Sequence, residues 1–121
     1  MLYAILCYHD EAEVCGWPQE KDDAVIAKRR VVTNDLAAKG KLGPVVRLMP
    51  TTAATTVKSG SEPLVIDGPF AETKEQLLGL YIIDCATREE AVETARRMGH
   101  DESGKFEVRP LRYFAPGAGT P

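Results

Sequence analysis

The residues best suited to chemistry are an acid at a sharp bend and a histidine at the end of an apolar run. Asp67 ends a short apolar segment and is followed by Gly68 and Pro69, which favour a tight turn. His9 ends the apolar segment 2–8. A carboxylate beside an imidazole fixes the ring tautomer and leaves the other nitrogen free to act as a general base or acid near neutral pH. His9 and Asp67 are therefore the candidate catalytic pair.

Both residues also have a simpler interpretation. Asp67 can accept hydrogen bonds from the turn that follows it, and His9 can end a strand without a special partner. A carboxylate held by a turn is also a preorganised one, so the two roles of Asp67 are compatible. The sequence leaves these alternatives open.

Four more residues are candidates for binding a ligand. Phe70 follows the bend, and Glu72 and Lys74 come directly after it. Arg47 lies late in an expected strand, at the edge of the domain where His9 is also expected. Its guanidinium can bind an anion. The alternatives are a core position for Phe70, solvated charges at Glu72 and Lys74, and a surface or interface salt bridge at Arg47.

The cysteines offer no clear site. Cys7 precedes His9 by two positions, and residues so placed on a strand lie about 7 Å apart at Cα, so an inert buried thiol is expected. The three cysteines have no metal-like spacing, and no phosphate loop or nucleophile elbow is present. No metal or cofactor is expected.

Length and composition indicate one domain over 1–113 with a flexible, Gly- and Pro-rich tail over 114–121. The net charge of −3 is spread along the chain without a basic stripe, which argues against a nucleic-acid partner. The basic cluster Lys28-Arg29-Arg30 falls in a helical pattern and is interpreted as a solvated face.

The chain offers no sign of a membrane or export segment. No apolar run approaches the ~20 residues that span a bilayer. The first residues lack a basic leader and a cleavage site, so no signal peptide is expected. The odd cysteine count suits a reducing compartment, and a cytoplasmic location is expected.

Periodicity and turn signals predict two helices and six strand-like segments. A capping box at Thr87 to Glu90 opens the second helix, and Thr73 with Gln76 can cap one helical turn. The expected strands are 2–9, 42–48, 79–85 and 105–113; the first helix is 20–39, the loop 10–18, and a hairpin joins 52–58 to 63–67.

This order predicts an α+β, ferredoxin-like βαββαβ fold with the hairpin inserted between its second and third strands. The expected order is last, first, third and second strand, all antiparallel. That order brings the end of the first strand, at His9, and the connection after Asp67 to one edge of the domain. Both faces of the third strand carry large apolar residues, as Leu80 and Tyr81 illustrate, so a homodimer packed sheet to sheet is expected.

The run 67–76, DGPFAETKEQ, resembles the DGPF branch of the YCII-related family. The resemblance continues through Gly79–Asp84 and Glu107–Leu111 and covers essentially 1–113. It implies a ferredoxin-like fold that dimerises into an α+β barrel, and a cleft with a His–Asp pair, for which Asp67 matches the acid of the motif. Some members resemble proteins that process chlorinated catechols or muconolactone, and members are often found near extracytoplasmic-function sigma factors.

Two functions are therefore carried forward. The first is a dimeric small-molecule protein with its cleft at the Asp67/His9 edge, performing acid–base chemistry on a small anionic or aromatic compound. The second is a non-catalytic regulatory or protein-interaction module linked to sigma-factor-dependent transcription. The sequence does not decide whether the protein is an enzyme.

Overall fold

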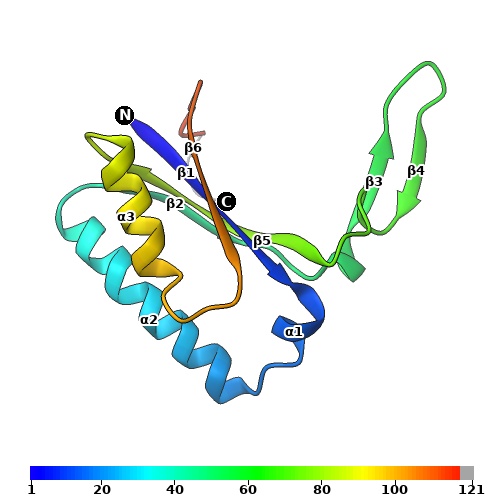
Figure 1. The fold of residues 1–121 in the computed structure, drawn as a ribbon. Coiled ribbons are helices and arrows are strands. Elements are labelled where there is room, and N and C mark those ends of the chain that lie inside the picture. Colours follow the sequence, from blue (N-terminus) through cyan, green and yellow to red (C-terminus); the bar gives the residue numbers. More distant parts are fainter. Residues whose placement is uncertain (118–121) are drawn as a thin grey trace.

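A four-stranded antiparallel sheet with two helices on one face forms the body of the computed structural model, which describes residues 1–117 (Figure 1). The helices are α2 (Gln19–Ala38) and α3 (Arg88–Met98). In sheet order the strands are β2 (Leu42–Arg47), β5 (Glu75–Asp84), β1 (Leu2–Asp10) and β6 (Lys105–Pro110). This is the strand order expected from the sequence, with every neighbour antiparallel.

The core lies between the sheet and the helices. Alternate residues of β1 are buried, namely Tyr3, Ile5, Cys7 and His9, as the two-residue period of a strand requires. Helix α2 contributes Val32 and Leu36, and α3 contributes Ala91, Ala95 and Met98. The face of α2 that carries Val25, Arg29, Val32 and Leu36 is thus turned toward the sheet.

The capping of α3 agrees with the sequence pattern. The Thr87 hydroxyl accepts a hydrogen bond from the backbone N–H of Glu90 at 3.2 Å. The Glu90 carboxylate in turn accepts from the N–H of Ala86, one residue before the cap. The first contact satisfies one of the N–H groups that a helix end leaves unpaired, and the second holds the residue before the cap.

Three local expectations were wrong. The segment expected as a loop over 10–18 contains a short helix, α1 (Glu11–Cys15), because the Asp10 side chain accepts from the Ala12 N–H and caps it. No helical turn forms at Thr73 to Gln76; β5 begins earlier than expected, at Glu75, and the Gln76 amide donates to two loop carbonyls. Strand β6 ends at Pro110, short of 113, and residues 111–117 form no strand.

The hairpin is present but shorter than expected. Strand β3 (Thr55–Lys58) pairs with β4 (Leu64–Asp67), and a single 3₁₀ turn, η1 (Thr51–Ala53), occupies the first residues assigned to it. Figure 1 shows the hairpin standing away from the sheet. Consistent with this, all four residues of β4 are exposed, including Val65 at 65%.

Strand β5 carries one more residue than its partner. Cys7 pairs with Gly79, but Tyr8 pairs with Leu77, so Leu78 has no partner on β1 and forms a β-bulge. As a result, His9 lies opposite Gln76.

The sheet face without helices is apolar at its centre. Leu6 and Leu80 lie opposite each other there, half-buried, beside Ile82. The expected tail, 114–121, is described only to residue 117, without helix or strand; 118–121 lie outside the described residues.

Candidate functional site

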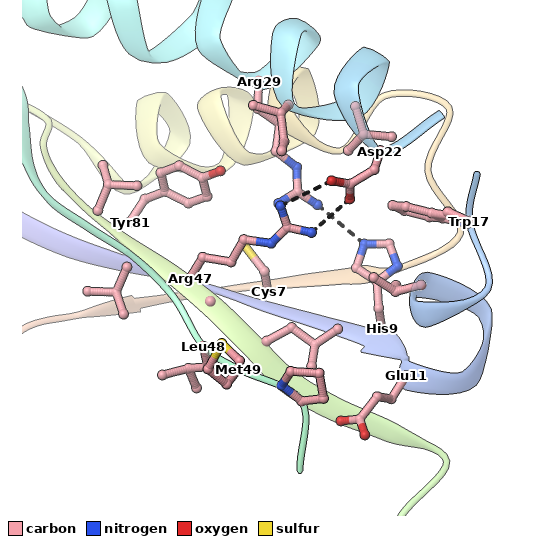
Figure 2. Close-up of a pocket in the computed structure, with 18 of the residues that line it drawn as sticks. Cys7, His9, Glu11, Trp17, Asp22, Arg29, Arg47, Leu48, Met49 and Tyr81 are labelled. Atoms are coloured by element: carbon pink, nitrogen blue, oxygen red, sulfur yellow. Dashed lines mark hydrogen bonds and ion pairs between the residues drawn. The ribbon is translucent and has the colours of Figure 1, made fainter. Parts of the chain in front are cut away.

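A cleft of about 540 Å³ lies between α2, the ends of β1 and β2, and the middle of β5 (Figure 2). Its walls are mostly apolar. They include Val25 and Ile26 from the helix, and Val45, Leu48, Met49 and Leu78 from the sheet side. A concave apolar site with a few polar groups is the usual form of a small-molecule site.

His9 lines this cleft and is only 3% exposed. Strand β1 turns the ring toward the helices, since His9 shares the inward face with Cys7. The rings of Trp17 and Phe106 meet it edge to face, at centroid distances of 5.7 and 6.0 Å. Gly104 lies against the ring, where a Cβ atom would come within 2.4 Å of Nε2. The imidazole is thus held on several sides.

The partner of His9 is Glu102, in the loop before β6. The His9 Nε2 lies 3.1 Å from the Glu102 Oε1, and the Glu102 side chain is 3% exposed. Arg29 of α2 donates to both carboxylate oxygens, at 3.1 and 2.5 Å, and the Lys28 Nζ lies 2.9 Å from Oε2. A buried carboxylate thus has three partners, as a buried charge requires.

This network shifts the pKa of both charged centres. Burial alone would raise the pKa of Glu102, but the hydrogen bonds from His9, Arg29 and Lys28 hold it at about 2. Burial alone would lower the pKa of Arg29, but Glu102 raises it above its ordinary value. Glu102 is therefore ionised and Arg29 charged at neutral pH.

The network also assigns the histidine tautomer. An ionised Glu102 only accepts hydrogen bonds, so the Nε2 of His9 must carry the proton that it donates. Arg29 only donates, so the 3.3 Å contact between its Nη2 and Nε2 is not a second hydrogen bond in this tautomer. The Nδ1 of neutral His9 is then a free acceptor, and it has no partner among residues 1–117.

An ion pair crosses the mouth of the cleft. Arg47, at the end of β2, places its Nη2 2.8 Å from the Oδ1 of Asp22 on α2 (Figure 2). The Arg47 side chain is 59% exposed and that of Asp22 is 23% exposed. This is the salt bridge that the sequence left as the alternative for Arg47, and both of its residues line the cleft.

The structure does not bring Asp67 to His9. Asp67 ends β4 on the projecting hairpin, and its side chain is exposed. Other residues hold the turn after it, since the Gly68 N–H donates to the Ala54 carbonyl and the Gly68 carbonyl accepts from the Thr56 hydroxyl. Within one chain, the imidazole partner is Glu102 and not Asp67.

The other candidates near the bend are also at the surface. Phe70 is 91% exposed, so the core interpretation of this residue is wrong. Glu72 is exposed, and the Lys74 Nζ lies 4.0 Å from an Asp10 oxygen with its side chain 83% exposed. None of the three lines the cleft that contains His9.

The interpretation of Lys28-Arg29-Arg30 as a solvated face was wrong for Arg29. Its side chain is 18% exposed, pairs with Glu102 and lies over the Phe106 ring at 5.2 Å. Arg29 has helical spacing with the buried Val32 and Leu36, and that signal could have identified a buried cation. Glu102 carried no comparable signal, since it lies in a short polar loop 93 positions from His9.

Cys7 is a buried free thiol, as expected. It is 1% exposed, and burial raises the pKa of its thiol to about 11, with Glu102 adding to the effect and Arg29 opposing it. The part of the chain that the structure describes has no group of three His, Cys, Asp or Glu side chains placed to hold a metal ion. Within the same residues, no helix combines the length and apolar character needed to cross a bilayer.

Comparison with known proteins places this geometry in a family. Residues 1–115 match the model of the YCII-related domain. An uncharacterized protein of Rhizobium meliloti (strain 1021) is 51% identical over 120 residues, which cover 97% of each chain. The match spans the sheet, both long helices and the cleft. The chain belongs to the YCII-related family.

Proposed function

We propose that this protein binds a small molecule in the cleft and that His9 acts there as a general base or acid. The observation that carries the proposal is the state of His9. One ring nitrogen is held by the buried Glu102, and the other is unpartnered among the described residues and belongs to a side chain that lines the cleft. An imidazole oriented by a carboxylate through one nitrogen is the arrangement that leaves the other to move a proton.

The cleft favours a small apolar or aromatic compound with an anionic group. Its walls supply aliphatic surface, and Arg47 at the mouth supplies a cation that is only partly buried. An anionic group can replace Asp22 as the partner of Arg47, while the apolar part of the compound enters between α2 and the sheet. Acid–base chemistry on such a compound is the reaction class that we propose.

We further propose that the protein is a ferredoxin-like homodimer of the DGPF branch, as an α+β barrel, in the cytoplasm. The support is apolar surface that one chain leaves uncovered. On the hairpin, Val57, Leu64 and Val65 are 62, 53 and 65% exposed. The helix-free sheet face around Leu6 and Leu80 is also apolar. Surface of this kind marks an interface in a folded protein.

In such a dimer the residues near the bend acquire a role. Asp67 and Phe70 are exposed and do not line the cleft of their own chain. They, with Glu72 and Lys74, reach a ligand only where a second copy brings a cleft to them. We propose that they act in that way, with Asp67 as a second catalytic group.

A screen by ligand-observed NMR tests the binding site. Small aromatic acids that bind the wild type should lose binding in His9→Phe and retain it in Val92→Thr, a change at an exposed position on α3. Incubation of each hit, followed by mass spectrometry, reports turnover. Failure of every hit to distinguish the two variants would contradict a site at His9.

A second candidate function, a non-catalytic interaction module linked to sigma-factor-dependent transcription, is favoured by the same exposed hairpin. The two candidates differ in the mass of the isolated protein. The dimer proposal requires light scattering to give about twice the chain mass of 13.2 kDa. Ile66→Lys on β4 should lower that mass toward one chain. A wild-type chain that stays monomeric at micromolar concentration favours the interaction module.

A further inference from the structure

Trp17 forms the wall of the cleft next to His9. It lies in the short connection between α1 and α2, and its side chain lines the cleft (Figure 2). Its ring meets the His9 ring at an interplanar angle of 80°. The Lys21 Nζ lies over the indole ring of Trp17, 5.0 Å from its centroid.

The two rings share an unusual property. Across the described residues, the buried side-chain nitrogen and oxygen atoms without a hydrogen-bond partner are two, the Nε1 of Trp17 and the Nδ1 of His9. Buried polar atoms are nearly always paired, and an unpaired one costs free energy. Both exceptions lie in adjacent rings at one end of the same cleft. This coincidence indicates a shared partner.

The chemistry of the two nitrogens specifies that partner. The indole nitrogen only donates a hydrogen bond, and the Nδ1 of neutral His9 only accepts one, since Nε2 carries the proton given to Glu102. A hydroxyl group satisfies both, because its oxygen accepts from Trp17 and its hydrogen is donated to His9. A carbonyl or ether oxygen cannot donate to Nδ1, and an ammonium group cannot accept from the indole.

We propose that Trp17 and His9 form a hydroxyl-binding subsite for a phenol or enol group on an apolar ligand. This rests on the proposed small-molecule function and names the substrate class for it. When His9 acts as a base, the ligand O–H bond breaks and an N–H bond forms at Nδ1. The resulting oxyanion retains the hydrogen bond from Trp17, and the imidazolium is stabilised by Glu102.

Binding requires a small movement. Both nitrogens are covered by neighbouring side chains in this structure, so the indole must turn before an oxygen lies between the rings. Trp17 is well placed for this, because it belongs to a connection between helices, flanked by Gly16 and Pro18.

The experiment uses the fact that Trp17 is the only tryptophan in the chain. A ¹H–¹⁵N spectrum therefore contains one indole N–H signal, which reports directly on the proposed hydrogen bond. Phenol, anisole and toluene are matched probes. Phenol carries a hydroxyl that can donate and accept, anisole has an ether oxygen that can only accept, and toluene has no hydrogen-bonding group. Phenol should shift the indole signal and bind about 10-fold more tightly than anisole, the difference that one hydrogen bond makes.

Trp17→Phe keeps an aromatic ring and removes the donor, so it should bring the affinity for phenol close to that for anisole. Val92→Thr serves as the control. Equal binding of all three probes to the wild type, with perturbed cleft resonances, overturns the hydroxyl subsite and leaves the cleft in place. If no probe perturbs the cleft resonances and the screen of aromatic acids gives no hit, both the hydroxyl subsite and the proposed small-molecule function are overturned. The wild-type indole signal remains a test even if Trp17→Phe fails to fold.

Discussion

The Nε2 of His9 and the Oε1 of Glu102 lie 3.1 Å apart, although 93 positions separate the two residues in the chain. The first comes from the end of β1 and the second from the loop that leads into β6. Because Arg29 reaches the same carboxylate from α2, three segments that are distant in sequence meet at one buried acid. This acid both supports the fold and orients the imidazole.

Replacement of Glu102 by Gln should cost about 3 kcal/mol of folding free energy, because it leaves the buried Arg29 without its counter-charge. Urea denaturation at pH 7 measures this. Glu93→Gln, which removes an exposed acid of α3, is the control and should leave the free energy of unfolding nearly unchanged.

The same variant alters acid stability. The pKa of Glu102 is lowered from 4.5 to about 2 in the fold, so its stabilisation is complete above pH 4.5 and is lost as the pH falls toward 2. A shift of this size corresponds to on the order of 3 kcal/mol. Glu102→Gln should flatten the dependence of unfolding free energy on pH between these values. Parallel profiles for the wild type and the variant would contradict the assignment.

Gly104→Ala should displace the His9 ring. The added Cβ would lie 2.4 Å from Nε2, too close for the ring to stay in place. We expect a loss of about 1–3 kcal/mol, as for other overpacked sites, and a change in the NMR signals of His9. The chain has two histidines, so His100→Gln assigns the spectrum. Ser61→Ala, in the exposed hairpin turn, should change neither quantity.

Asp22 and Arg47 should have opposite effects on an anionic ligand. Asp22→Asn frees the guanidinium and should raise the affinity several-fold, whereas Arg47→Gln should lower it by a similar factor. Both variants should keep nearly wild-type stability, because an exposed ion pair contributes about 0–1 kcal/mol. Titration calorimetry at two salt concentrations checks this, since the difference should shrink as salt increases. Equal affinities in the two variants would exclude Arg47 from ligand binding.

The cysteines should differ sharply in reactivity. Cys15 is exposed, whereas Cys7 and Cys85 are buried, and burial raises the pKa of both buried thiols. With a pKa of about 11, Cys7 is ionised in about one molecule in a thousand at pH 8. A disulfide reagent should therefore modify one thiol rapidly in the native protein and three in denaturant. Cys15→Ser should abolish the rapid phase, and a second rapid thiol would contradict the burial of Cys7.

The sheet was predictable because its signals are local and strong. The apolar runs of β1 and β5 and the cap at Thr87 define elements directly, and chain order with right-handed crossovers then gives the strand order. The helix α1 was missed because Asp10 ends a strand and caps a helix at once. A polar residue after an apolar run indicates that a strand ends, but it does not show whether a loop or a helix follows.

The site was harder to predict because it depends on direction as well as position. The topology correctly placed His9 near one end of the sheet, but the segment that contains Asp67 leaves that end as a projecting hairpin. Glu102 occupies a loop that, in sequence, is typical of solvent-exposed residues. Its burial follows from Gly104, which lets the loop approach the imidazole, and from Arg29 across the cleft.

The bulge at Leu78 makes the lining of the cleft depend on the length of β5. Upstream of the bulge, Gln76 shares a face with His9; downstream, the odd-numbered residues Gly79 and Tyr81 do. Removal of Leu78 would close the bulge and leave the pairs Cys7–Gly79 and Tyr8–Leu77 in register, so the neighbouring side chains would keep their faces. Leu78 itself lines the cleft, so the extra residue adds an apolar side chain to the cleft wall without changing the register of β5 with β1.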